Sequence, residues 1–172
     1  MSFFTRYRMI GLAIAALVFM IDQWVKRQMI GSLKLNEIRM IEILPFFNLT
    51  WTENYGVSLG LLTADSTEMR WLLVLVTATI AFAVLIWMFR ERHFGDIFGL
   101  SLVLGGAMGN IRDRINMGFV IDYADLHFGT FRPFLIFNIA DAAITIGVVI
   151  ILARSLFSRE KPDARAESAP ES

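Results

Sequence analysis

The sequence predicts an all-α membrane protein, with four transmembrane helices and a small outward-facing β-strand region between helices 1 and 2. Hydrophobic residues make up 56% of the 172 residues, and the mean hydropathy is +0.57. These residues gather in blocks, and a block of about 20 apolar residues crosses a bilayer as a helix. Residues 40–62 are instead rich in β-branched and aromatic residues with turn-forming residues between them, which favours short strands.

The apolar blocks define four predicted spans. The first, about residues 9–25, lacks the small-residue pattern of a cleaved signal peptide, and the second covers residues 71–89. The third, residues 97–111, is the weakest because its apolar part is short. The fourth covers residues 134–153. We therefore expect one membrane-embedded domain at 1–157, outward segments at 26–70 and 112–133, and a disordered polar tail at 158–172.

Basic residues predict the orientation of these spans. An even number of crossings places both ends of the chain on one side of the membrane. Arg90 and Arg92 lie in a short loop, and Arg6 and Arg8 adjoin the first span. Basic residues in short loops and near span ends favour the cytoplasmic side. Both termini are therefore predicted in the cytoplasm, with the long segments facing outward.

Composition excludes several classes of function. The formal net charge is zero, so no basic surface points to nucleic acid. The chain has no cysteine, which excludes disulfides, thiolate metal sites and a cysteine nucleophile. His127 has no second nitrogen or sulfur ligand near it in the sequence, so we expect no metal and no cofactor. Nothing in the sequence implies an oligomer.

Asp141 is the most informative residue of the fourth span. An aspartate near the middle of a span costs about 3 kcal/mol, so it needs a reason to be there. Asn138 and Asp141 share a helix face, as do Asn110 and Arg114 on the third span. A second carboxylate beside Asp141 would form a pair that shares a proton and can hydrolyse a peptide bond. Spacing alone leaves the partner open, and the candidates are Asp22, Asp113, Asp122 and Asp125.

Five motifs resemble one known family. DQWVK at 22–26 is similar to Asp-Gln-x-x-Lys, and TENYGVSLG at 52–60 resembles an outward Asn-x-Gly segment. GNIRDR at 109–114, VIDYAD at 120–125 and FNIAD at 137–141 complete the set. Five such motifs in order resemble the bacterial lipoprotein signal peptidases, signal peptidase II, a family of intramembrane aspartic peptidases. The resemblance covers about residues 9–153.

The resemblance implies a function and a set of site residues. It implies cleavage just before the lipid-modified cysteine of bacterial prolipoproteins. It also implies that membrane lipids surround the protein. It implies that Asp122 and Asp141 are the catalytic dyad. The remaining implied residues lie around the dyad and the substrate or support the site: Asn54, Asn110, Arg114, Asn138, Asp22 and Lys26. Ile121, Tyr123 and Leu59 depart from the family pattern and leave the dyad unchanged.

Other roles and functions remain open at this point. Asp113 suits an ion pair or a helix cap, and Asp125 suits a charged loop residue exposed to solvent. Asp22 and Lys26, at i and i+4, suit a pair at the membrane interface. The small residues at Gly105, Gly106 and Gly109 suit close helix packing. A proton-coupled transporter using the same aspartates as relay groups, or an assembly protein that binds partner helices, are the alternative functions.

Overall fold

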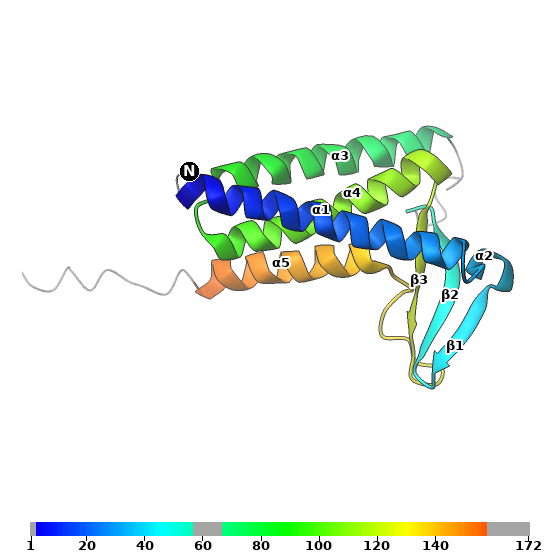
Figure 1. Ribbon diagram of the computed structural model, residues 1–172. Helices are drawn as coiled ribbons and strands as arrows, with labels where there is room; N and C mark the ends of the chain where they lie inside the picture. Colours follow the sequence, from blue (N-terminus) through cyan, green and yellow to red (C-terminus); the bar gives the residue numbers. More distant parts are fainter. Residues whose placement is uncertain (1–2, 57–66, 158–172) are drawn as a thin grey trace, which may run out of the picture.

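The computed structural model describes residues 3–56 and 67–157. Four helices in it are long and apolar enough to cross a membrane. They are α1 (Phe3–Ile30), α3 (Thr67–Arg90), α4 (Phe94–Met117) and α5 (Ile139–Phe157), and a short helix, α2 (Leu35–Ile38), follows α1. The long helices lie side by side as a bundle, and the start of α1 and the end of α5 are at the same end (Figure 1). We call this the terminal end.

Helix α4 is the centre of the bundle and packs against each of the other long helices. Sixty-one per cent of its most apolar window is buried, against 17% for α3 and 17% for α5. Glycines make this close approach possible. A Cβ atom on Gly105 would lie 2.5 Å from the Ala15 carbonyl oxygen of α1, and one on Gly106 would lie 2.4 Å from the Ala140 carbonyl oxygen of α5. The predicted packing role of these glycines is confirmed.

The outer faces of the helices are apolar. Leu75 is 65% exposed, Phe82 62% and Val149 59%. Such a surface is stable in lipid, where a helix satisfies its backbone hydrogen bonds internally. The exposed apolar side chains therefore belong against acyl chains.

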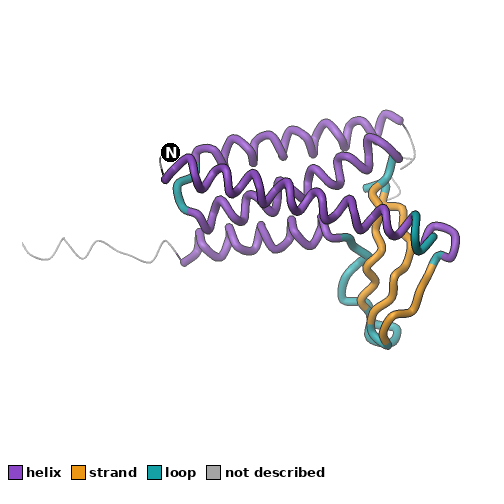
Figure 2. Tube along the Cα trace, in the orientation of Figure 1, coloured by secondary structure: helices purple, strands orange, loops and turns teal. Residues whose placement is uncertain are grey.

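A small antiparallel sheet covers the other end of the bundle, which we call the sheet end (Figure 2). Its order is β1-β2-β3, with β1 at Met40–Leu44, β2 at Phe47–Asn54 and β3 at Val120–Leu126. Leu35, Trp51 and Ile121 belong to a separate hydrophobic core that packs the sheet against the end of α1. The sheet is thereby fixed to the bundle, and its residues are held at constant positions relative to the helix ends.

The turn from α4 into β3 fixes where the third strand begins. Gly118 follows α4 in the left-handed region, with φ of 90°, and its N–H donates to the Arg114 carbonyl oxygen. Arg70 of α3 donates to the carbonyl oxygens of Arg114 and Ile115 as well. Carbonyl groups at the end of α4 thus find partners within the protein.

The predicted fold class is confirmed, with differences in detail. β3 comes from the segment between the third and fourth helices, whereas strands were expected only within 40–62. The fourth helix begins at Ile139 and not at 134, and the third extends over Phe94–Met117. Residues 57–62 of the expected strand region and the tail at 158–172 lie outside the described residues.

Candidate active site

Asp141 is fixed in the first turn of α5 by a reciprocal cap. The Asp141 backbone N–H donates to Oδ1 of Asn138 at 2.9 Å, and the Asn138 backbone N–H donates to Oδ2 of Asp141 at 3.2 Å. This is a capping-box arrangement, in which two backbone donors at a helix start are satisfied together. It gives the reason that α5 begins at Ile139, and it orients the carboxylate toward α4.

Asp122 lies on β3, beside the start of α5. The backbone of Phe137 exchanges hydrogen bonds with Ala124 of β3, at 2.8 and 3.1 Å, which places the next residue, Asn138, against the strand. Nδ2 of Asn138 donates to Oδ1 of Asp122 at 2.7 Å, and Nδ2 of Asn54 on β2 donates to Oδ2 at 2.9 Å. Asn138, only 1% exposed, therefore contacts both carboxyl groups.

Asn110 of α4 binds Asp141 from the opposite side. Its Nδ2 donates to Oδ1 of Asp141 at 2.8 Å, while its Oδ1 accepts a hydrogen bond from Nζ of Lys26 at 3.2 Å. An ammonium group can only donate. Lys26 therefore sets the orientation of the Asn110 amide, so that its N–H group faces the Asp141 carboxylate.

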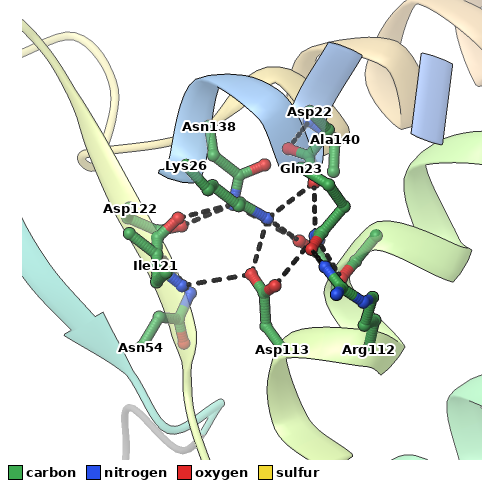
Figure 3. A network of polar contacts seen from close by, with 12 residues as sticks. Asp22, Gln23, Lys26, Asn54, Arg112, Asp113, Ile121, Asp122, Asn138 and Ala140 are labelled. Carbon is green, nitrogen blue, oxygen red and sulfur yellow. Dashed lines mark hydrogen bonds and ion pairs between the residues drawn. The ribbon is translucent and has the colours of Figure 1, made fainter. Parts of the chain in front are cut away.

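Lys26 also joins a buried ion cluster with Asp22 and Asp113 (Figure 3). Its Nζ lies 2.9 Å from Oδ2 of Asp22 and 2.7 Å from Oδ2 of Asp113, and all three side chains are at most 2% exposed. The predicted pairs are thus present, in the interior and not at an interface. Oδ1 of Asp22 accepts the Ala140 backbone N–H at 3.1 Å, which ties α1 to the first turn of α5.

The Asp122 carboxyl group has an altered acidity. Burial, in the first place, and the nearby negative charge of Asp141 raise its pKa from 3.8 to about 6, although hydrogen bonds from Asn54 and Asn138 work in the opposite direction. This is the behaviour of a carboxyl group that is desolvated next to another one. Asp122 therefore holds a proton at a pH where an ordinary aspartate has lost it.

This raised pKa predicts a pH-dependent stability. Stability contributed by protonated Asp122 is fully present below about pH 4 and is lost as the pH rises through about 6, by about 3 kcal/mol. Asp122→Asn removes the titrating group, so its unfolding temperature should fall less than that of the wild-type protein between pH 4 and pH 7. If the unfolding temperatures of the two proteins fell equally between pH 4 and pH 7, this result would contradict the raised pKa of Asp122.

Arg114 lies close to these acids without pairing with them. Its charge acts on Asp141, Asp122 and Asp113, yet within the described residues no hydrogen bond joins it to any of the three. Its Nε is buried and has no partner among the described residues, and a nitrogen of its guanidinium lies near Gly56. Arg114 thus has donor capacity that this part of the chain does not use.

The expectation for Asp125 is wrong, because its side chain is buried and not solvated. Asp125 is 1% exposed. Its Oδ1 lies 3.0 Å from Nε of Arg132, and Thr50 of β2 donates to its Oδ2 at 3.2 Å. The hydrogen bond and charge of Arg132 lower the Asp125 pKa. Asp125 therefore fastens the 127–137 loop to the sheet. It takes no part in the hydrogen-bonded group that we call the Asp122 cluster: Asp122, Asp141, Asn54, Asn110, Asn138 and Lys26.

Two cavities meet at the pair of aspartates. One, of about 610 Å³, is lined by Asp122, by β2 residues including Asn54, and by the loop that contains Arg132. The other, of about 300 Å³, is lined by Asp141 and mainly by apolar residues of α5 and of the loop before it. Phe134 and Leu135 line both cavities. Asp122 thus faces a cleft with mixed polar and apolar lining, and Asp141 faces a more apolar one.

In the described part of the chain, the side chains grouped closely enough to hold a metal ion lie away from these cavities. Glu91, His93 and Asp96, at the terminal end, bring their ligand atoms within 4.8 Å of one another. Their oxygens already have protein partners, because both oxygens of Asp96 bind Arg154 and Oε1 of Glu91 accepts backbone N–H groups. The Asp122 cluster itself contains carboxyl, amide and ammonium groups.

Sequence reasoning missed two contributors. Gln23 was passed over, although its Nε2 donates to Oδ1 of Asp113 at 2.9 Å and to Oδ2 of Asp22 at 3.1 Å. Arg112 donates to Oε1 of Gln23. Gln23 lies in the DQWVK motif and Arg112 in the GNIRDR motif. The signal that could have identified them was a polar side chain in each motif without an assigned partner.

Comparison with known proteins places this geometry in a family. The family model described as "Signal peptidase (SPase) II" matches residues 14–157. A lipoprotein signal peptidase of Rhizorhabdus wittichii is 51% identical over 162 residues, which are 94% of each chain. One from Sphingopyxis alaskensis is 49% identical over 164 residues, 95% of this chain and 94% of the other.

A solved structure agrees with the sequence relatives. A bacterial membrane enzyme determined by the in meso method at 1.9 Å superposes with a TM-score of 0.74 and 29% identity, covering 88% of this chain and 94% of the other. A second such structure, at 2.3 Å, gives a TM-score of 0.71. The chain belongs to the signal peptidase II family.

Proposed function

We propose that this protein is an intramembrane aspartic endopeptidase that removes the signal peptide from diacylglyceryl-modified prolipoproteins by cleaving before the lipidated cysteine. The observation that carries the proposal is the placement of Asp122 and Asp141 on separate elements, both bound to Asn138. Residues 1–157 form its single membrane-embedded domain. Membrane lipids surround it, and the reaction needs no cofactor.

Asp122 is the general acid in this proposal. Its raised pKa makes it the proton-holding member, and an apolar substrate that excludes water would raise the pKa further. Asp141 is the general base in this proposal. Its carboxylate oxygens accept hydrogen bonds from Asn110 and from the Asn138 backbone, which hold the carboxylate in a fixed orientation.

Hydrolysis then balances without a covalent intermediate. Asp141 takes a proton from water as the water oxygen attacks the scissile carbonyl carbon, and Asp122 gives its proton to the carbonyl oxygen. The C–N bond breaks when the leaving nitrogen receives the proton held by Asp141. As the new carboxyl group forms, the hydroxyl made from the carbonyl oxygen returns its proton to Asp122, which restores the starting state. The unused donors of Arg114, together with Asn54, would hold the substrate backbone by hydrogen bonds that lipid cannot supply.

The two cavities support a substrate that is partly in lipid. The apolar cavity beside α5 suits the signal peptide or acyl chains, whereas the cleft containing Asp122, Asn54 and Arg132 suits the polar chain beyond the cut. The relatives carry the name lipoprotein signal peptidase, and this name supplies the substrate class that geometry alone leaves open.

We further propose that the sheet end faces the periplasm of a bacterial inner membrane and that both termini are cytoplasmic. Arg90 and Arg92, between α3 and α4, lie at the terminal end and support this orientation. Reporter fusions after residues 35 and 92 should report the outer and the cytoplasmic side. An outer location for residue 92 would put the site in the wrong compartment.

The function is tested with the purified full chain in lipid vesicles and two versions of one precursor, with and without the diacylglyceryl group on cysteine. Mass spectrometry should find the signal peptide released from the lipidated version alone. Equal cleavage of both versions would contradict the substrate assignment. Proton flux across the vesicles without any cleavage would favour the transporter, and neither activity would favour the assembly protein.

A further inference from the structure

A separate polar cavity opens between α1 and α4 at the sheet end, and neither Asp122 nor Asp141 lines it. Its volume is about 190 Å³. Arg27 and Arg112 line it together with Gln23 and Asn116, and so do Lys26 and Asp113, whose opposite charges pair with each other. We call it the arginine cavity.

The two guanidinium groups of the arginine cavity have no acidic partner in residues 3–56 and 67–157. Arg112 donates to Oε1 of Gln23, a neutral group, and no ion pair is found for Arg27 in that part of the chain. The nearest acid, Asp113, is already occupied, because Lys26 binds its Oδ2 and Gln23 its Oδ1. Two permanent positive charges are therefore available to an external anion.

Arg112 is held in place before any ligand arrives. Gln23 is 7% exposed, and its amide is fixed by donating to Asp113 at 2.9 Å and to the Gly109 carbonyl at 3.3 Å. The amide oxygen of Gln23, Oε1, accepts a hydrogen bond from one end of the Arg112 guanidinium. The other N–H groups of that guanidinium stay free among the residues that the structure describes. A planar donor group held in this way suits the oxygens of a phosphate, which guanidinium groups bind through paired hydrogen bonds.

The surroundings of the arginine cavity indicate a lipid as the source of that phosphate. Trp24, three residues before Arg27 on the same face of α1, is 62% exposed, as expected of a tryptophan at a membrane interface. Met20 on α1 and Met108 on α4, further along the helices toward the bilayer centre, are 57% and 46% exposed. An acyl chain can lie along these side chains while its head group reaches the two arginines.

We propose that the arginine cavity binds the phosphate of an anionic phospholipid from the surrounding leaflet. The proposal concerns lipid binding and holds or fails independently of the peptidase assignment, since neither aspartate contacts the cavity. Its test therefore measures binding and not cleavage.

The test is native mass spectrometry of the full-length protein in detergent, titrated separately with phosphatidylglycerol, phosphatidylcholine and inorganic phosphate. The wild-type protein should bind one phosphatidylglycerol with a Kd about ten-fold or more below that for phosphatidylcholine. The Arg27→Gln/Arg112→Gln double variant should lose this preference. Lys34→Gln, which removes an exposed charge near the same end of the bundle but outside the cavity, should keep it.

Three results would overturn the lipid site. One is equal affinity of the wild-type protein for the two lipids, a result that does not depend on whether any variant folds. Another is an unchanged preference in the double variant. The last is inorganic phosphate that binds as tightly as phosphatidylglycerol, which would show an ion site without a lipid. An Arg27→Lys/Arg112→Lys variant, which keeps both charges, should still prefer phosphatidylglycerol and serves as the check on folding.

Discussion

Replacing either Asp122 or Asp141 by asparagine is expected to lower kcat for a lipidated precursor by about a thousand-fold or more. Asparagine keeps the shape of the side chain but can neither take a proton from water nor supply one to the carbonyl oxygen. Loss of one positioned acid or base usually lowers the rate by between about 10²-fold and 10⁴-fold. When two residues act together in one step, the effects of replacing them do not add. The double variant should therefore be little worse than either single variant.

The control for the aspartate variants is Asp96→Asn. Asp96 is also partly buried and paired, with Arg154 at 2.9 Å, but it lies at the terminal end. It should retain wild-type cleavage, which separates loss of chemistry from loss of a buried carboxylate. Cleavage rates follow from the appearance of released peptide in single-turnover reactions, and circular dichroism verifies that each variant is folded. Substantial cleavage by either Asp122→Asn or Asp141→Asn would remove the mechanism.

Replacing Lys26 by methionine is expected to lower the free energy of unfolding by about 3–5 kcal/mol. The change removes the cation between Asp22 and Asp113, which are 0% and 1% exposed. Methionine has a similar length, so the main cost is two buried carboxylates without a compensating charge. The Asn110 amide also loses the contact that orients it, so cleavage should fall as well.

Two further variants test this explanation. Asp22→Asn/Lys26→Met/Asp113→Asn removes the stranded charges and should recover part of the lost stability. Lys34→Gln breaks an exposed pair, 3.9 Å from Glu37, and should cost about 0.5 kcal/mol or less. Unfolding followed in mixed micelles with increasing denaturing detergent compares the four proteins. A Lys26→Met variant as stable as Lys34→Gln would mean that the cluster is not a source of stability.

Hydropathy predicted the bundle because each span must be apolar over much of its length, whatever its neighbours are. Hydropathy did not predict the residue at which α5 begins. Residues 134–137 are apolar and continue the hydrophobic block, and only the reciprocal cap between Asn138 and Asp141 shows that the helix begins later. An apolar pattern does not distinguish a helix from the extended segment that precedes it.

The third strand was missed for a related reason. Residues of β3 from Val120 to Asp125 are all buried, so the strand has no alternation of apolar and polar side chains to reveal it. Two of those buried residues are aspartates, and their partners are distant in sequence. Asp122 binds Asn54, and Asp125 binds Thr50. Spacing along a helix could place Asn138 beside Asp141, but the choice of Asp122 as the second acid came from the family resemblance.

In the proposed reaction, Asp122 and Asp141 activate water to cut one defined peptide bond. The most direct measurement is cleavage of a lipidated precursor by the wild-type protein in ¹⁸O-labelled water, with both products weighed by mass spectrometry. We expect a cut immediately before the lipidated cysteine and one ¹⁸O atom in the new carboxylate of the released signal peptide. An intact precursor, a cut at another bond, or a released peptide without the label would contradict it.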